Sequence, residues 1–171
     1  MNTKRMMRIA MIAAIYTVLC IVPGLSMISY GQVQVRIAEA LTLLPLIYKP
    51  SIVGVTLGCF LANLIGLMTG VNPTGTIDLV VGTLATFLAA NCTYLFRNRT
   101  VHNIPVLSML MPVIFNFIFI GLELAFILMP DNILLGTIIN GTYVAIGELI
   151  AVIIGYFLIQ ALKKTKIFEE E

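Results

Sequence analysis

Apolar residues fill most of the chain in six runs that are separated by short polar stretches. The runs cover residues 8–27, 34–48, 51–69, 76–96, 105–129 and 136–162. A helix needs about 20 apolar residues to cross the roughly 30 Å hydrocarbon core of a bilayer, and shorter spans occur where other protein covers them. The pattern therefore predicts an all-α polytopic membrane protein with six transmembrane helices in one integral domain, residues 1–171. The second run is the weakest, because it is short and contains Arg36, Glu39 and Pro45.

The composition is that of an integral membrane protein. Of the 171 residues, 60% are hydrophobic and 11% charged, whereas about a quarter of the residues of a soluble domain are charged. The net charge of +2 is spread along the chain, so no nucleic-acid partner is expected. Cys20, Cys59 and Cys92 lie in apolar runs at spacings that fit neither a zinc site nor a redox pair. We expect no metal and no cofactor.

The basic residues predict the orientation of the chain. Cytoplasmic loops of membrane proteins carry the excess of Lys and Arg. With six spans and both termini in the cytoplasm, the inner side receives Lys4, Arg5, Arg8, Lys49, Arg97, Arg99, Lys163, Lys164 and Lys166. Only Arg36 then falls on the outer side. The predicted location is the cell membrane, with N- and C-termini cytoplasmic.

Apart from Arg8 at the cytoplasmic start of the first run, five charged residues lie within the predicted spans: Arg36, Glu39, Asp78, Glu123 and Glu148. Each would cost at least about 2.5 kcal/mol in hydrocarbon, so each should face protein or water. Arg36 and Glu39 are three residues apart and can pair across a helical turn, which leaves the other carboxylates without a cation. An unpaired carboxylate in a dry site either takes up a proton or accepts hydrogen bonds from a ligand. Its two oxygens suit the paired N–H donors of a guanine-like base.

Polar and small residues share one helical face in several runs. In the last run, those within an arc of roughly 100° are Thr137, Asn140, Gly141, Glu148, Ala151 and Gly155. In the fourth run, the same kind of arc holds Asp78, Gly82, Ala85, Thr86, Ala89 and Thr93. These faces should form the inside of a bundle. For the small and hydroxyl residues, close packing between membrane helices is the simpler interpretation.

Motifs for enzymatic chemistry are absent. The sequence has no GxxxxGK[ST] phosphate loop, so this chain cannot hydrolyse ATP, and it has no HExxH, CxxC or GxSxG motif. We expect that it is not an enzyme. Ala10 and Ala14 form an AxxxA pattern in the first run, a face that lets another helix approach closely.

The segment YGQVQVRIAEALTLLP at residues 30–45, together with the six runs and AxxxA, resembles the QueT family of S-components of energy-coupling factor (ECF) transporters. The resemblance covers essentially the whole chain. It implies a substrate-binding subunit that docks on a transmembrane coupling protein and two cytoplasmic ATPases, with Ala10 and Ala14 on the docking face. It also implies a queuosine precursor as cargo, a 7-deazaguanine such as preQ1 or queuine.

This cargo fits the carboxylates. A 7-deazaguanine with an aminomethyl arm offers a guanine-type donor edge and an ammonium, for which we expect Glu39 and Glu148 as partners. The residues expected to support them are Asp78, Glu123, Asn140 and Tyr143. Arg36 is expected to donate to the O6 acceptor of the ligand or to hold Glu39 in place.

Three alternatives stay open. The first is an S-component for another vitamin, although an anionic vitamin would require more cations than Arg36. The second is a solitary proton-coupled carrier, in which Glu123 or Glu148 would be the proton site. The third is a structural membrane protein whose carboxylates pair with neighbouring chains and bind no ligand.

Overall fold

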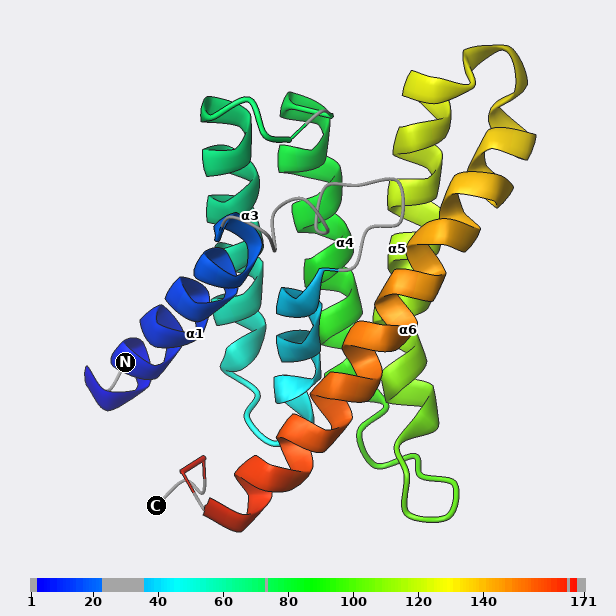
Figure 1. Ribbon diagram of the computed structural model, residues 1–171. Coiled ribbons are helices and arrows are strands. Elements are labelled where there is room, and N and C mark those ends of the chain that lie inside the picture. The colour runs from blue at the N-terminus through cyan, green and yellow to red at the C-terminus, as the bar shows by residue number, and fades with distance from the viewer. Residues whose placement is uncertain (1–2, 23–35, 73, 166, 169–171) are drawn as a thin grey trace.

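The chain folds as a bundle of helices in the computed structural model, which describes residues 3–22, 36–72, 74–165 and 167–168. The elements, in chain order, are α1 (Thr3–Ile21), η1 (Ile37–Leu46), α3 (Ser51–Met68), α4 (Thr76–Leu95), α5 (Val106–Leu128), η2 (Pro130–Asn132) and α6 (Ile133–Thr165) (Figure 1). No strand occurs in these ranges; Val101 and Ile104 form an isolated bridge in a turn. The all-α prediction is confirmed.

Four of the predicted runs coincide with long helices. The bounds of α3, α4 and α5 differ from the runs 51–69, 76–96 and 105–129 by one residue at most, and α6 extends 136–162 by three residues at each end. These four helices are long and apolar enough to cross a membrane. The first run coincides with α1 up to Ile21, and its last residues, 23–27, lie outside the described part of the chain.

The second run forms a much shorter element than a spanning helix. η1 is a 3₁₀ helix of 10 residues, so its length is about 20 Å at 2.0 Å per residue, against the roughly 30 Å core of a bilayer. Its residues from Ala38 to Pro45 are all buried. It contacts α1, α3, α4, α5 and α6. The run is therefore apolar because it lies in the centre of the bundle, with Arg36 just before its first turn.

Glycines let the helices approach η1 and one another closely. A Cβ on Gly155 of α6 would lie 2.5 Å from the backbone oxygen of Ala40 in η1. A Cβ on Gly58 of α3 would lie 2.6 Å from Cβ of Tyr16 in α1. Both distances are shorter than any real carbon contact, so only glycine fits. These two glycines, of which Gly155 lies on the predicted face of the last run, thus bring together the segments that carry the buried polar groups.

The outer surface of the long helices is apolar. Among its exposed large side chains are Val53 on α3, Val80 on α4, Phe126 on α5 and Phe157 on α6. Soluble monomers rarely expose contiguous apolar surface on this scale. The carboxylates of Glu39, Asp78, Glu123 and Glu148, in contrast, are buried inside the bundle. Apolar side chains on the outside and carboxylates on the inside suit a lipid environment. The sequence predicts this distribution because polar and small residues share one face of a run and large apolar residues occupy the others.

Candidate functional site

All five ionisable residues that the sequence places within its spans lie together in the centre of the bundle. The exposed fractions are 5% for Arg36, 0% for Glu39, 1% for Asp78, 3% for Glu123 and 2% for Glu148. They come from η1 and the residue before it, from α4, from α5 and from α6. Glu39 interacts electrostatically with Arg36 and Asp78, Glu123 with the same two, and Glu148 with Glu39 and Arg36. We call these five residues the acidic cluster.

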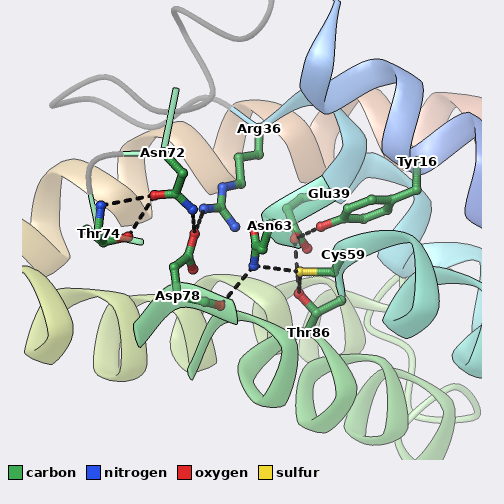
Figure 2. A network of polar contacts seen from close by, with 9 residues as sticks. All are labelled: Tyr16, Arg36, Glu39, Cys59, Asn63, Asn72, Thr74, Asp78 and Thr86. Carbon is green, nitrogen blue, oxygen red and sulfur yellow. Dashed lines mark hydrogen bonds and ion pairs between the residues drawn. The ribbon is translucent and has the colours of Figure 1, made fainter. Parts of the chain in front are cut away.

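Arg36 forms an ion pair with Asp78. Its Nη2 lies 2.6 Å from Asp78 Oδ2, and Asn72 donates from Nδ2 to the same oxygen at 2.8 Å. Thr74 donates to Asn72 Oδ1 through both its backbone N–H, at 3.1 Å, and its hydroxyl, at 2.8 Å. Figure 2 shows how Arg36, Asn72 and Asp78 point toward one another. The carboxylate of Asp78 is thus held from two sides.

This geometry corrects two sequence expectations. The prediction that Asp78 has no cationic partner was wrong, since Arg36 supplies one. The spacing of Arg36 and Glu39 also suggested a pair within one helical turn. Arg36 instead precedes η1 with an extended backbone, φ −82° and ψ 92°, so its side chain reaches across to α4. The helical i, i+3 rule applies only where both residues are helical.

Glu39 is held by groups from two other helices. Its Oε1 accepts a hydrogen bond from the hydroxyl of Tyr16 on α1 and one from Thr86 Oγ1 on α4, at 3.2 Å. Thr86 Oγ1 also lies 3.3 Å from the Sγ of Cys59. Asn63 of α3 donates to the backbone oxygen of Asp78 at 2.9 Å. Figure 2 shows these contacts as one network that links Glu39 to Asp78.

Several carboxylate oxygens of the acidic cluster have no hydrogen-bond partner although they are buried. They are Glu39 Oε2, Asp78 Oδ1, Glu148 Oε2 and both oxygens of Glu123, with which the Thr74 hydroxyl interacts without a hydrogen bond of normal geometry. Buried polar atoms without a partner are rare in native proteins, so a group of them calls for an explanation. As acceptors only, ionised carboxylates suit a ligand that brings N–H donors and positive charge. No set of three or more His, Cys, Asp or Glu side chains in the described ranges is arranged to hold a metal ion.

Asn140 and Tyr143 do not join this cluster. Asn140 is half-buried and donates from Nδ2 to the backbone oxygen of Gly136, one turn earlier in its own helix. Tyr143 is 47% exposed. Close to Tyr143 in α6, the residues that face inward are Gly141, Val144, Gly147 and Glu148. At about 100° per residue, this turns Tyr143 outward.

The sequence reasoning missed Tyr16, Asn72 and Thr74. Tyr16 lies one turn from both Ile12 and Cys20, and all three are buried on the inner face of α1. That periodicity was a usable signal, since a tyrosine on a buried face needs a partner for its hydroxyl. Asn72 and Thr74 lie in the loop between α3 and α4, where nothing in the local sequence marks them as partners of Asp78.

Ala10 and Ala14 lie on the opposite, exposed side of α1. Met7 and Met11, also exposed, flank them. The face combines small and flexible apolar side chains, and it is continuous along more than two turns of the helix. It is therefore open to contact by another helix.

Known proteins match the chain over nearly its whole length. Residues 6–164 match the family described as QueT transporter. The chain is 32% identical over 172 residues to the queuosine precursor transporter QueT of Lactococcus lactis subsp. cremoris (strain MG1363), covering 95% of this chain and 94% of that relative. No solved structure matches the chain.

Proposed function

Since the chain belongs to the QueT transporter family, we propose that it is the membrane-embedded S-component of an ECF-type importer, with a queuosine precursor as its cargo. The family and the four long apolar helices make it a multi-pass membrane protein. The cargo would be a 7-deazaguanine such as preQ1 or queuine. The observation that carries the proposal is the excess of buried carboxylates over cations in the acidic cluster.

The chemistry of the ligand complements the unpaired oxygens. The N1–H and 2-amino group of a deazaguanine form a donor edge that matches the two oxygens of one carboxylate, and an aminomethyl ammonium would pair with a second. Glu39 and Glu148 are the proposed partners, because both have an unpaired oxygen and they interact with each other electrostatically. Such a ligand would remove the repulsion between them.

The other members of the acidic cluster have supporting roles in this proposal. Arg36 and Asp78 are an ion pair that fixes the residue before η1 against α4. Glu123 adds a negative charge next to them, which favours a cationic ligand. Tyr16 holds one oxygen of Glu39, so that its second oxygen has a defined direction.

The exposed AxxxA face of α1 supports the second half of the proposal. A subunit without an ATPase motif needs an energy source, and in ECF importers a transmembrane coupling protein and two cytoplasmic ATPases supply it. We propose that Ala10 and Ala14 meet the coupling protein. Because Tyr16 of the same helix contacts Glu39, α1 would connect the docking face with the ligand site.

The proposed topology has six passes and both termini in the cytoplasm. The second pass includes η1, which is shorter than a full span but is covered by the other helices of the bundle. The six helices α1, η1, α3, α4, α5 and α6 follow the order of the six apolar runs, and basic residues are in excess at one set of ends. A membrane-impermeant maleimide applied to whole cells tests this orientation. A cysteine introduced as Asp131→Cys should be labelled and one introduced as Lys164→Cys should not; the reverse pattern would overturn the orientation.

Equilibrium binding to the detergent-purified chain tests the proposed cargo. PreQ1 and queuine are titrated, with guanine, riboflavin and biotin as controls. Saturable binding of a deazaguanine alone supports the proposal. Binding of riboflavin or biotin would indicate an S-component for another vitamin. Binding of none, with uptake that needs no partner and collapses with a protonophore, would indicate a solitary proton-coupled carrier.

A further inference from the structure

A second polar site lies at one end of the bundle, away from the acidic cluster. It is a cavity of about 60 Å³ between the loop after α4, the end of η1 and the last turns of α6. This is the end drawn at the bottom of Figure 1. A water molecule needs about 10–15 Å³ by this measure, so the cavity has room for several waters or for one small oxyanion.

The polar residues that line this cavity are Arg97, Thr100, Asn103, Gln160 and Lys163. They offer two cationic groups together with hydroxyl and amide donors. No acidic residue is among those that line it. Donors and positive charge without an acid favour an anion, and the planar guanidinium of Arg suits phosphate oxygens especially well.

Arg97 is held in position before any ligand binds. Its Nη1 donates to the backbone oxygen of Tyr94 at 2.9 Å, and its guanidinium carbon lies 3.9 Å from the centre of the Tyr94 ring. The side chain is half-buried. A guanidinium has five N–H donors, so the one bond to Tyr94 leaves others for an anion. Positioning in advance reduces the entropy lost on binding.

The cavity lies at the level where the apolar helices end. Arg97 follows the last residue of α4 by two positions, Pro105 directly precedes α5, and Lys163 is in the last turn of α6. Leu46 and Tyr156 form part of its wall. At this level a phospholipid presents its phosphate to the protein while its acyl chains remain beside the apolar surface of the bundle.

We propose that this cavity binds a phosphate group, and that the phosphate is that of an anionic phospholipid. Arg97 and Lys163 pair with its oxygens, and the amides of Asn103 and Gln160 donate further hydrogen bonds. The apolar surface next to the cavity accommodates the acyl chains. This site is independent of the transported cargo, since its residues are separate from the acidic cluster.

Native mass spectrometry of the detergent-purified full chain tests the site. The probes are phosphatidylglycerol, diacylglycerol with the same acyl chains, and inorganic phosphate. We expect phosphatidylglycerol to bind and diacylglycerol not to bind, with inorganic phosphate competing only at far higher concentration. Equal binding of diacylglycerol would overturn the role of the phosphate. Binding of inorganic phosphate at concentrations as low as those of phosphatidylglycerol, or no binding of phosphatidylglycerol, would overturn the lipid source.

Matched variants locate the binding. Lys163→Gln removes an exposed charge that lines the cavity, and we expect it to weaken phosphatidylglycerol binding about tenfold. Lys164→Gln, its neighbour outside the lining, is the control and should leave binding within about twofold. Arg97→Gln should weaken binding at least as much as Lys163→Gln. An equal effect of Lys163→Gln and Lys164→Gln would overturn the site in favour of general surface charge.

Discussion

The two sides of the acidic cluster differ in how their carboxylates are bonded. On the α1–α4 side, Asp78 accepts from Arg36 and Asn72, and Glu39 accepts from Tyr16 and Thr86. On the α5–α6 side, neither oxygen of Glu123 has a hydrogen bond of normal geometry, since the Thr74 hydroxyl that interacts with it donates to Asn72. A bonded carboxylate contributes to the fold, whereas an unbonded one destabilises it. We infer that the first side holds the structure and offers the ligand only Glu39 Oε2, which has no partner, whereas the carboxylates of the second side are kept for the ligand.

The largest effect is expected from removing a bonded carboxylate on the α1–α4 side. Asp78→Ala removes the partner of a buried Arg36, and loss of one member of a buried ion pair costs about 3–5 kcal/mol. We expect a large fall in the thermal unfolding temperature in detergent, together with loss of ligand binding. Asp131→Ala, at an exposed acid in η2, is the control and should leave the temperature unchanged. Equal stability of the two variants would show that the ion pair does not support the fold.

The second test addresses the α5–α6 side. Glu148→Gln removes a charge and keeps the shape of the side chain, so the free energy of unfolding should stay the same or rise. Ligand affinity should fall about 10–100-fold, the equivalent of one charge-assisted hydrogen bond. Calorimetric titration with a deazaguanine, beside a thermal melt of the same sample, measures both. A variant that loses stability but binds as before would reverse the assignment of the two sides.

The third test changes the close contact between η1 and α6, which connects the two sides of the acidic cluster. Gly155→Ala puts a methyl group against the Ala40 backbone of η1, so α6 and η1 must separate; overpacking of this kind costs about 1–3 kcal/mol. Because Glu39 and Glu148 lie on these two segments, both stability and affinity should fall. Ile154→Ala, on the exposed side of the same helix, should change affinity little. Unchanged affinity in Gly155→Ala would mean that the ligand does not bridge η1 and α6.

The long helices could be predicted from sequence because each is a predominantly apolar run of spanning length. η1 could not, since hydropathy gives a buried internal segment and a lipid-facing span the same signal. Its true length is set by contacts with five other helices. The apolar pattern therefore predicts which residues avoid water, and the tertiary structure decides whether protein or lipid surrounds them.

The members of the acidic cluster were predictable for a similar reason. A carboxylate inside an apolar run is expensive in lipid, so burial in the bundle follows for Glu123 and Glu148. The partner of Asp78 was not predictable, because Arg36 is 42 residues away in the chain and the pair depends on how η1 and α4 pack. Tyr143 shows the opposite case: it is close to a polar stripe in the sequence, and the rotation of α6 turns it outward.

The smallest expected effect concerns the hydrogen bond between α1 and Glu39. Tyr16→Phe keeps the buried ring and removes only the hydroxyl, so the loss in stability should be about 1 kcal/mol. Thr86 remains on the same carboxylate oxygen, which limits the damage. Tyr143→Phe makes the same chemical change at an exposed position and should have no measurable effect in the same thermal melts. If the two variants behave alike, Glu39 gains nothing from Tyr16 and is held by Thr86 alone. If Tyr16→Phe also alters ligand affinity, α1 is part of the binding site as well as of the fold.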